Sequence, residues 1–243
     1  GATGTIGAEV VRVAAARGHG VRALSRATGV DVREGSGLEN ALRGSDAVVD
    51  VLGVVTQSTA KSVAFFEETT AQLLEAERRV GVGHHLALSI VGVHHAPSGY
   101  YAGKVAQELA VEAGEIPWTI LRATQFHDFA AQMFARTAMG PVHPVISARV
   151  QPVDIAELAT RIVDLVERGP SGRAVDFAGP REEELGAMMR AWGRRQGRRV
   201  WMPRVLLPGA MGTAMRDGSL MPGQDADLGR VTFEAWLAER AAE

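Results

Sequence analysis

The sequence predicts an α/β fold in which a doubly wound parallel sheet carries helices on both faces. Three observations support this prediction. A turn with regularly spaced glycines at residues 1–7 leads into an amphipathic helical pattern. Short, nearly continuous apolar runs at residues 47–53 and 86–92 are typical of strands that are buried on both faces. These runs alternate with helical segments, and right-handed crossovers of this kind join parallel strands.

Composition and charge narrow the class of protein. The chain has 243 residues, enough for one large α/β unit with a small appendage. Its 26 basic and 28 acidic residues give a formal net charge of −2, which gives no reason to expect binding to nucleic acid or to an anionic membrane. Without cysteine, the chain has no disulfide and no thiolate metal site. No apolar run approaches the roughly 20 residues of a membrane span, and we expect a cytoplasmic protein.

The opening stretch GATGTIG is the element around which the fold is organised. Its glycines would let the chain turn sharply, bring backbone N–H groups to a pyrophosphate and pack the next helix against a sheet. The alternative is a glycine-rich helix start without a ligand, because the GxxGxxG spacing alone is a weak signal. A strand is expected before such a turn, so we expect a first strand upstream of residue 1. The candidate cofactor-binding residues here are Gly1, Gly4, Thr5, Ile6 and Gly7.

The next two apolar runs, residues 21–24 and 30–32, are predicted to be the second strand and the end of the third. In a doubly wound fold the second strand ends beside the adenosine ribose, where a carboxylate binds the 2′-OH and an arginine binds a 2′-phosphate. Arg26 occupies that position and favours NADPH over NADH, although an ordinary solvated loop charge is the alternative. Asp31 is expected near the adenine. Gly53, the last residue of the apolar run at 47–53, would leave open backbone for the cofactor.

The remaining elements divide the chain into a dinucleotide-binding core, residues 1–127, and a C-terminal part, residues 128–243. The second part is expected to form a lid and substrate-binding elements and to return late strands and helices to the core. Arginines at the end of its helix at 182–199 are interpreted as a solvated helix end. The other predicted helices are 38–42, 61–80, 100–111, 129–139, a helix from about 154 to 167 capped by Asp154, and a final helix from about 232; the other strands are 118–122 and 174–178.

Three side chains form the expected catalytic group. Ser89 lies at the end of the strand at residues 86–92, and Tyr100 and Lys104 share one helical face because they are four residues apart. An ammonium near a phenol stabilises the phenolate and lowers the phenol pKa from about 10. Ser89 would hold a substrate oxygen, Tyr100 would protonate a carbonyl oxygen as hydride arrives, and Lys104 would also reach the nicotinamide ribose. The alternative is an amphipathic helix with a surface lysine and a half-buried tyrosine.

These motifs resemble those of the atypical short-chain dehydrogenase/reductases, in particular the NmrA-like group with its NAD(P)H-binding GATGxxG turn. The resemblance covers essentially the whole chain and implies a Rossmann fold, a nicotinamide cofactor and reduction of small carbonyls, quinones or related acceptors. Several NmrA-like members have lost the tyrosine and act as redox-dependent regulators, whereas this sequence retains Ser89, Tyr100 and Lys104. The matching stretches beyond the turn are residues 88–93, 100–104, 118–126, 151–156 and 233–237.

The predicted function is that of an NADPH-preferring oxidoreductase whose partner is a small, mostly apolar carbonyl or quinone-like substrate. A cofactor-sensing regulator and an NAD(P)-dependent sugar epimerase or dehydratase are the alternatives. The histidine pairs at 84–85 and 94–95 are not expected to bind a metal, because neighbouring strand residues point to opposite faces. The loop after the strand at 118–122 should line the substrate pocket with Thr124, Gln125, Phe126 and His127.

Overall fold

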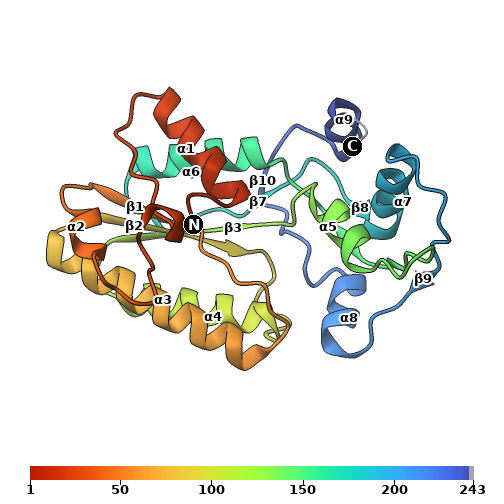
Figure 1. Cartoon of the computed structure of the whole chain (residues 1–243), viewed down its shortest axis with the longest axis horizontal. Coiled ribbons are helices and arrows are strands. Elements are labelled where there is room, and N and C mark those ends of the chain that lie inside the picture. Colours follow the sequence, from red (N-terminus) through yellow and green to blue (C-terminus); the bar gives the residue numbers. More distant parts are fainter. Residues whose placement is uncertain (241–243) are drawn as a thin grey trace. The chain divides into compact units, whose positions relative to one another are not determined.

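The computed structural model describes residues 1–240 and has the expected α/β fold (Figure 1). A six-stranded sheet has the order β1-β2-β3-β7-β10, and β6 also pairs with β3. The pairs β1–β2, β3–β6, β3–β7 and β7–β10 are parallel, which confirms the predicted sheet. These strands are β1 Ala47–Asp50, β2 His84–Ile90, β3 Trp118–Ala123, β6 Gly172–Arg173, β7 Phe177–Ala178 and β10 Asp227–Leu228.

The chain forms two compact units that alternate along the sequence. The first unit contains Gly1–Arg122 and Leu158–Val175, and the second contains Ala123–Glu157 and the residues from Asp176 onward. The sequence analysis divides the chain once, after residue 127. In the structure the chain returns to the first unit after residue 157 and leaves it again after residue 175.

Helices cover both faces of the sheet in the first unit. In Figure 1, α1 and α6 lie on one face, and α3 and α4 lie on the other. Arg17, which follows α1, donates to Asp164 (2.7 Å) and Glu167 (2.9 Å) on α6. The helices of this unit are α1 Thr5–Ala16, α2 Leu38–Leu42, α3 Thr59–Val80, α4 Tyr100–Ala113 and α6 Ile155–Arg168.

Local capping explains where several of these helices begin and end. Ser58 accepts a hydrogen bond from the N–H of Lys61 at the start of α3, two residues before the predicted start. Gly81 ends that helix with a φ of 78°, which suits glycine. At the start of α6, Asp154 accepts hydrogen bonds from the N–H groups of Ala156 (2.8 Å) and Glu157 (3.1 Å), as the sequence predicts.

Two predicted strands are absent from the described residues. In residues 21–24 the carbonyl of Leu24 accepts the N–H of Ala2 (3.3 Å), but this bond does not continue into a ladder of paired residues. Residues 30–32 enter a turn, in which the Asp31 carboxylate accepts the N–H of Arg33 (3.0 Å). The apolar patterns were misleading because a strand also requires a paired neighbour. Between these segments, Ser25 caps the 3₁₀ helix Arg26–Thr28.

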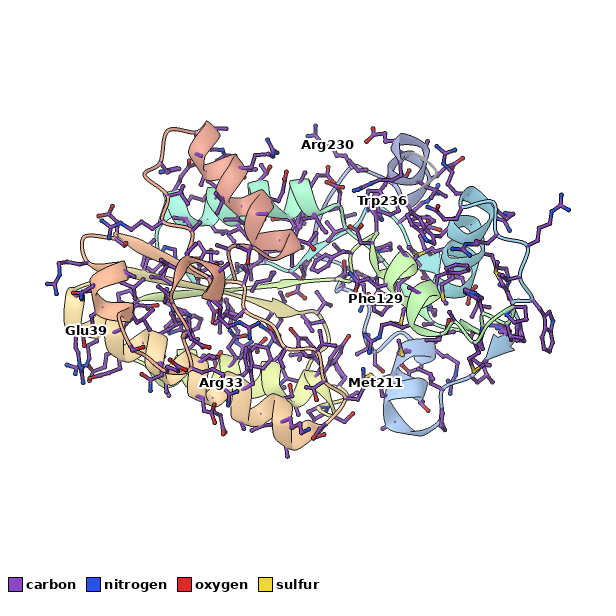
Figure 2. All side chains as sticks on the ribbon, viewed as in Figure 1. Arg33, Glu39, Phe129, Met211, Arg230 and Trp236 are labelled. Atoms are coloured by element: carbon purple, nitrogen blue, oxygen red, sulfur yellow. The ribbon has the colours of Figure 1, made fainter. Side chains whose placement is uncertain are left out.

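The second unit packs short strands and helices around its own apolar core. Phe134, Leu185, Met189 and Trp236 are among the buried side chains of that core, and Phe129 packs against it (Figure 2). The final helix begins after Thr232, as predicted. Its helices and strands are α5 Phe129–Arg136, α7 Leu185–Arg195, α8 Gly209–Asp217, α9 Phe233–Glu239, β4 Val145–Ile146, β5 Arg149–Val150, β8 Glu183–Glu184 and β9 Arg204–Val205.

Candidate active site

The opening turn closes on itself just before α1. The N–H of Gly4 donates to the carbonyl of Gly1 (3.0 Å), and the N–H of Ala8 donates to the carbonyl of Gly4 (2.8 Å). In the described part of the chain, no side chain caps the N-terminus of α1. The first N–H groups of a helix have no acceptor within the helix, and they attract anions. The start of α1 therefore has the geometry of a phosphate-binding turn.

Two glycines in this turn stand where no other residue fits. A Cβ on Gly7 would collide with the carbonyl oxygen of Gly1, and a Cβ on Gly1 would lie 2.8 Å from the carbonyl oxygen of Val51. Gly4 is less constrained, since its Cβ would stand 3.3 Å from the Gly1 oxygen. Because Gly7 has no side chain, the start of α1 packs closely against the turn. Because Gly1 has none, the turn packs closely against Val51, the residue that follows β1.

Tyr100 reaches the same segment after β1. Its phenol oxygen lies 3.2 Å from the position that a Cβ on Gly53 would occupy. Gly53 is two residues beyond Val51, against which Gly1 packs, and two extended residues span about 7 Å. The structure therefore brings the opening turn and the Tyr100 hydroxyl together at the carboxyl end of β1, where open α/β sheets bind their ligands.

Ser89 lies at the same edge of the sheet, on β2. The parallel register pairs Asp50 with Ala87, and continuing it puts Ser89 level with Leu52. The Ser89 side chain is buried, with 3% of the residue exposed. Ser89 and Tyr100 thus belong to one end of the β1–β2 pair.

Lys104 is buried beneath this edge. Its Nζ donates to the carbonyl of Leu88 (2.5 Å) and to Oε1 of Gln107, and it lies 4.7 Å from the centroid of the Phe66 ring. Burial lowers the pKa of Lys104 to about 8, although the charges of Asp50 and Glu108 oppose that shift. The ammonium is held by the protein rather than presented at the surface, which differs from the predicted reach to a ribose.

Asp50 and Gln107 extend this buried network, and the sequence analysis missed both. The Gln107 amide donates to the Asp50 carboxylate (2.6 Å), which also accepts the N–H of Leu52 (2.9 Å). Asp50 and Gln107 are 2% and 0% exposed. Two signals were present in the sequence: Gln107 is three residues from Lys104 on a helix, and Asp50 is the carboxylate in an otherwise apolar strand.

The direction of the Tyr100 pKa shift corrects one expectation. Burial raises the pKa of Tyr100 to about 12, and the negative charge of Asp50 adds to the rise. The sequence analysis expected Lys104 to lower this pKa. Its ammonium is instead engaged by Leu88 and Gln107, while the carboxylate of Asp50 lies close enough to Tyr100 to disfavour phenolate. Tyr100 is consequently a fully protonated phenol at neutral pH.

A second polar cluster surrounds Glu108 on α4. Its carboxylate accepts hydrogen bonds from Arg122 (2.9 and 2.6 Å), Arg173 (3.1 Å) and His94 (2.8 Å). Burial would raise the pKa of Glu108, but the hydrogen bonds from Arg122 and His94, with the Ser89 hydroxyl nearby, outweigh it and lower the pKa to about 2. Glu108 is therefore ionised, and it ties α4 to β3, to β6 and to the loop after β2.

Of the two predicted adenosine contacts, Arg26 follows a segment that touches the opening turn. The N–H of Ala2, in the turn, donates to the carbonyl of Leu24. Arg26, which is exposed, comes two residues after Leu24 in the chain. Asp31 is partly buried and holds its own turn through the N–H of Arg33. The structure thus keeps Arg26 close to the candidate phosphate site.

The four predicted substrate residues belong to the second unit and differ in burial. Thr124 is 2% exposed and donates to the carbonyl of Gln151 (2.6 Å). His127 is 1% exposed, its Nε2–H donates to the carbonyl of Val231 (3.0 Å), and its ring lies 5.8 Å from that of Trp236. Both side chains hold the unit together, whereas Gln125 and Phe126 are only partly buried.

Both histidines of β2 have protein partners. His84 lies 2.9 Å from the hydroxyl of Thr119, and Nδ1 of His85 lies 2.9 Å from the buried carboxylate of Glu77. Among residues 1–240, no three His, Asp or Glu side chains are grouped as metal ligands would be. No helix in that same range is long and apolar enough to cross a membrane.

Comparisons with known proteins identify the fold. A nucleoside-diphosphate-sugar epimerase from Staphylococcus aureus is 15% identical, with a TM-score of 0.70 over 98% of each chain. A UDP-glucose 4-epimerase from Thermus thermophilus, in complex with NAD, is 17% identical, with a TM-score of 0.64 over 99% of this chain and 98% of that chain. A short-chain dehydrogenase/reductase superfamily protein from Agrobacterium tumefaciens, with bound NAD, is 17% identical, with a TM-score of 0.68 over 98% and 94%.

At these identities the solved structures show a shared Rossmann-type fold. None of the curated protein sequences is a significant match. The model of the NAD(P)H-binding family matches residues 1–165, a range that includes the opening turn, Ser89, Tyr100 and Lys104. The matched range contains both the glycine turn and the sheet edge described above. This chain belongs to the NAD(P)H-binding family.

Proposed function

We propose that this chain is an NADPH-dependent oxidoreductase that reduces a small, mostly apolar carbonyl or quinone-like compound. One observation carries the proposal: the glycine turn packs on Val51, and the Tyr100 hydroxyl meets Gly53, two residues away. A dinucleotide whose phosphates lie at the start of α1 would extend along this edge of the sheet. Its nicotinamide end would then come near a proton donor.

The roles in this proposal follow from the protonation states. NADPH, when bound, supplies the hydride. Tyr100, with a pKa of about 12, stays protonated at neutral pH and donates its proton to the substrate oxygen. With a carbonyl substrate, the alcohol product is a weaker acid than this phenol, so the proton transfer to a developing alkoxide is downhill. A quinone gives a hydroquinone, itself a phenol with a pKa of about 10, and gains no such driving force. Ser89 lies at the same sheet edge and would position that oxygen.

Lys104 has a supporting role in this proposal. It joins α4 to the carbonyl of Leu88, the residue before Ser89, and it lies one helical turn from Tyr100. The ammonium thereby fixes the spacing between the serine and the phenol. Binding of the ribose by Lys104 would require its side chain to leave Gln107.

Arg26 is proposed to select NADPH by binding the 2′-phosphate. Changing Arg26→Asp should weaken NADPH use about tenfold to 100-fold, because a charge-assisted hydrogen bond is replaced by repulsion. NADH, which lacks that phosphate, should be affected far less. The measurement is kcat/KM for both cofactors in the wild type and the variant. Arg33→Asp, at an exposed arginine that pairs with Glu68, is the matched control and should leave the ratio unchanged. Equal losses for NADPH and NADH would contradict the assignment.

Gly7→Ala is expected to weaken NADPH binding about tenfold to 100-fold. The added methyl group collides with the Gly1 carbonyl, and overpacking of this kind costs about 1–3 kcal/mol. Titration of NADPH fluorescence measures the effect. Gly20→Ala is the control, because a Cβ on Gly20 would meet nothing within 4 Å. Wild-type affinity in Gly7→Ala would show that the cofactor lies elsewhere.

A second candidate function is the NAD-dependent conversion of a nucleotide sugar. The names of the structurally similar proteins favour it, since they include a nucleoside-diphosphate-sugar epimerase and a UDP-glucose 4-epimerase. Ten of the 17 residues at 123–139 are apolar, a larger share than the 46% of the whole chain, which favours an apolar substrate instead. The regulator hypothesis differs from both in requiring binding without turnover.

One experiment separates these functions. The purified protein is mixed with NADPH or NADH and a panel of ketones and quinones, and the loss of cofactor absorbance is followed. A parallel reaction contains NAD and UDP-glucose, with the sugar products analysed. Faster oxidation of NADPH than of NADH supports the proposal. Sugar conversion without cofactor consumption supports the second candidate, and tight NADPH binding without either reaction supports the regulator.

A further inference from the structure

The balanced net charge of this chain conceals a strong separation of charge. Residues 129–153 and 185–216 contain nine arginines and no aspartate or glutamate. These residues build α5, β4, α7, β9 and α8 of the second unit. Because the whole chain has a formal charge of −2, the other residues carry −11. The nine are Arg136, Arg149, Arg190, Arg194, Arg195, Arg198, Arg199, Arg204 and Arg216.

Most of these arginines keep an uncompensated charge. Arg149 pairs with Glu182, whereas Arg204 donates to the Ser147 hydroxyl and Arg216 to the carbonyl of Leu207, both of which are neutral. The others form no ion pair within the described residues. Arg198 and Arg199 are exposed in the loop between α7 and β9. The resulting positive field is not cancelled locally.

Large apolar side chains are exposed in the same region. Trp201 is 69% exposed, and Met139 and Leu206 are each 62% exposed. They are neighbours in the structure: Met139 pairs with Val142, Val142 pairs with Trp201, and β4 runs parallel to β9. Exposed apolar patches of this kind, rimmed by polar residues, mark interaction sites.

The burial of residues 201–207, which include β9, separates side chains that face the core from side chains that are exposed. Met202, Val205 and Leu207 pack against the apolar core of the second unit. Trp201, Arg204 and Leu206 are exposed. The inner side of this segment is therefore apolar, whereas its outer side carries both apolar and cationic side chains. We call Met139, Arg198, Arg199, Trp201, Arg204 and Leu206 the arginine-tryptophan face.

We propose that the arginine-tryptophan face binds the surface of an anionic phospholipid bilayer. Tryptophan is favoured at the boundary between lipid headgroups and acyl chains, where leucine and methionine gain by burial in the apolar layer. Arginine is attracted to lipid phosphates, to which its planar guanidinium donates two hydrogen bonds. An anionic bilayer offers phosphates above an apolar layer, so it can bind the arginines and bury the apolar side chains of the face at the same time.

The observations favour this partner over two others. A symmetric dimer through the same face would bring two arginine clusters together, and like charges repel. Nucleic acid would match the charge, and Trp201 offers one ring on which a base can stack, but Leu206 and Met139 offer it neither hydrogen bonds nor a stacking surface, whereas a bilayer buries all three apolar side chains. The sequence analysis expected no membrane partner because the net charge is close to zero. That total does not describe the local charge of this face, because the arginines are concentrated in one part of the chain.

The test is co-sedimentation of the full chain with vesicles of phosphatidylcholine alone or mixed with phosphatidylglycerol. We expect binding at least about tenfold tighter to the anionic vesicles, reduced by salt, with a blue shift of tryptophan emission. Trp201→Phe should keep much of the binding but lose most of the blue shift. The double variant Arg198→Glu and Arg199→Glu should abolish binding while leaving thermal unfolding and NADPH affinity unchanged.

The matched control is Leu109→Ser, which removes an exposed leucine (56%) from α4 in the first unit and should bind vesicles as the wild type does. Four results would overturn the inference. They are the absence of vesicle binding, equal binding to neutral vesicles, the same loss in Leu109→Ser, and a duplex oligonucleotide that outcompetes the vesicles. Salt-sensitive oligomers that form without vesicles and vanish in the double variant would assign the face to a second copy instead. None of these readouts depends on turnover, so they stand apart from the proposed reductase activity.

Discussion

Tyr100→Phe is expected to lower kcat for carbonyl or quinone reduction by about 10²- to 10⁴-fold, the usual contribution of a general acid. The phenol oxygen lies beside Gly53 at the carboxyl end of β1, and its pKa of about 12 keeps it protonated until the substrate oxygen becomes basic. Phenylalanine preserves the ring, which packs edge-on against Phe66 with 5.6 Å between centroids. The fold and NADPH affinity should therefore be nearly unchanged. Steady-state kinetics and a fluorescence titration measure the two quantities.

Tyr101→Phe provides the matched control for this variant. The two tyrosines are adjacent on α4, but successive helical residues point about 100° apart. A hydroxyl removed from position 101 should leave turnover close to that of the wild type. Full activity in Tyr100→Phe would rule out its role as the proton donor, and an equal loss in both variants would indicate a general disturbance of the helix.

Glu108→Ala is expected to lower the free energy of unfolding by about 3–5 kcal/mol, the usual result of removing one partner of a buried ion pair. The Glu108 side chain is 1% exposed, and its carboxylate binds Arg122, Arg173 and His94 from three different parts of the first unit. Truncation leaves a cavity and removes all of these bonds at once. Urea unfolding followed by circular dichroism measures the loss. Glu112→Ala is the control, because Glu112 pairs with Arg173 at a more exposed position (26%) and should cost about 1 kcal/mol or less.

The same carboxylate gives the protein a defined pH dependence. The pKa of Glu108 falls from 4.5 to about 2 on folding, so its contribution is complete above pH 4.5 and is lost as the pH falls towards 2. A depression of this size corresponds to roughly 3 kcal/mol. Glu108→Gln, which has no charge to titrate, should flatten the stability profile of the first unit between pH 5 and 2. An unchanged slope in that variant would mean that other carboxylates dominate.

The sequence predicted the parts of the fold that local pattern controls. The opening turn and α1, the helix at residues 38–42 and the Asp154 cap follow from glycine spacing, apolar periodicity and capping chemistry, all of which act within a few residues. The predicted strand at residues 21–24 failed for the opposite reason. Its apolar side chains are suitable, but a strand is defined by a neighbour elsewhere in the chain.

The buried polar contacts could not be predicted from local sequence patterns, because their partners lie far apart in the chain. Gln107 binds Asp50 across 57 residues, and Arg173 binds Glu108 across 65. Spacing identified Tyr100 and Lys104 as one helical face, yet it did not show that Gln107 and Leu88 take up the ammonium. The sign of the Tyr100 pKa shift was wrong for this reason, since it depends on which charge lies nearest in space.

The division of the chain has a consequence for how the protein is made. The first unit is complete only when α6 and β6 have been added, and these end at residues 168 and 173. At a synthesis rate of about 5–20 residues per second, the glycine turn and its sheet must wait several seconds on the ribosome for those last pieces. During that interval β3 lacks the neighbour that it will later find in β6. The backbone groups of β3 along this edge therefore stay unpaired until synthesis has passed residue 173.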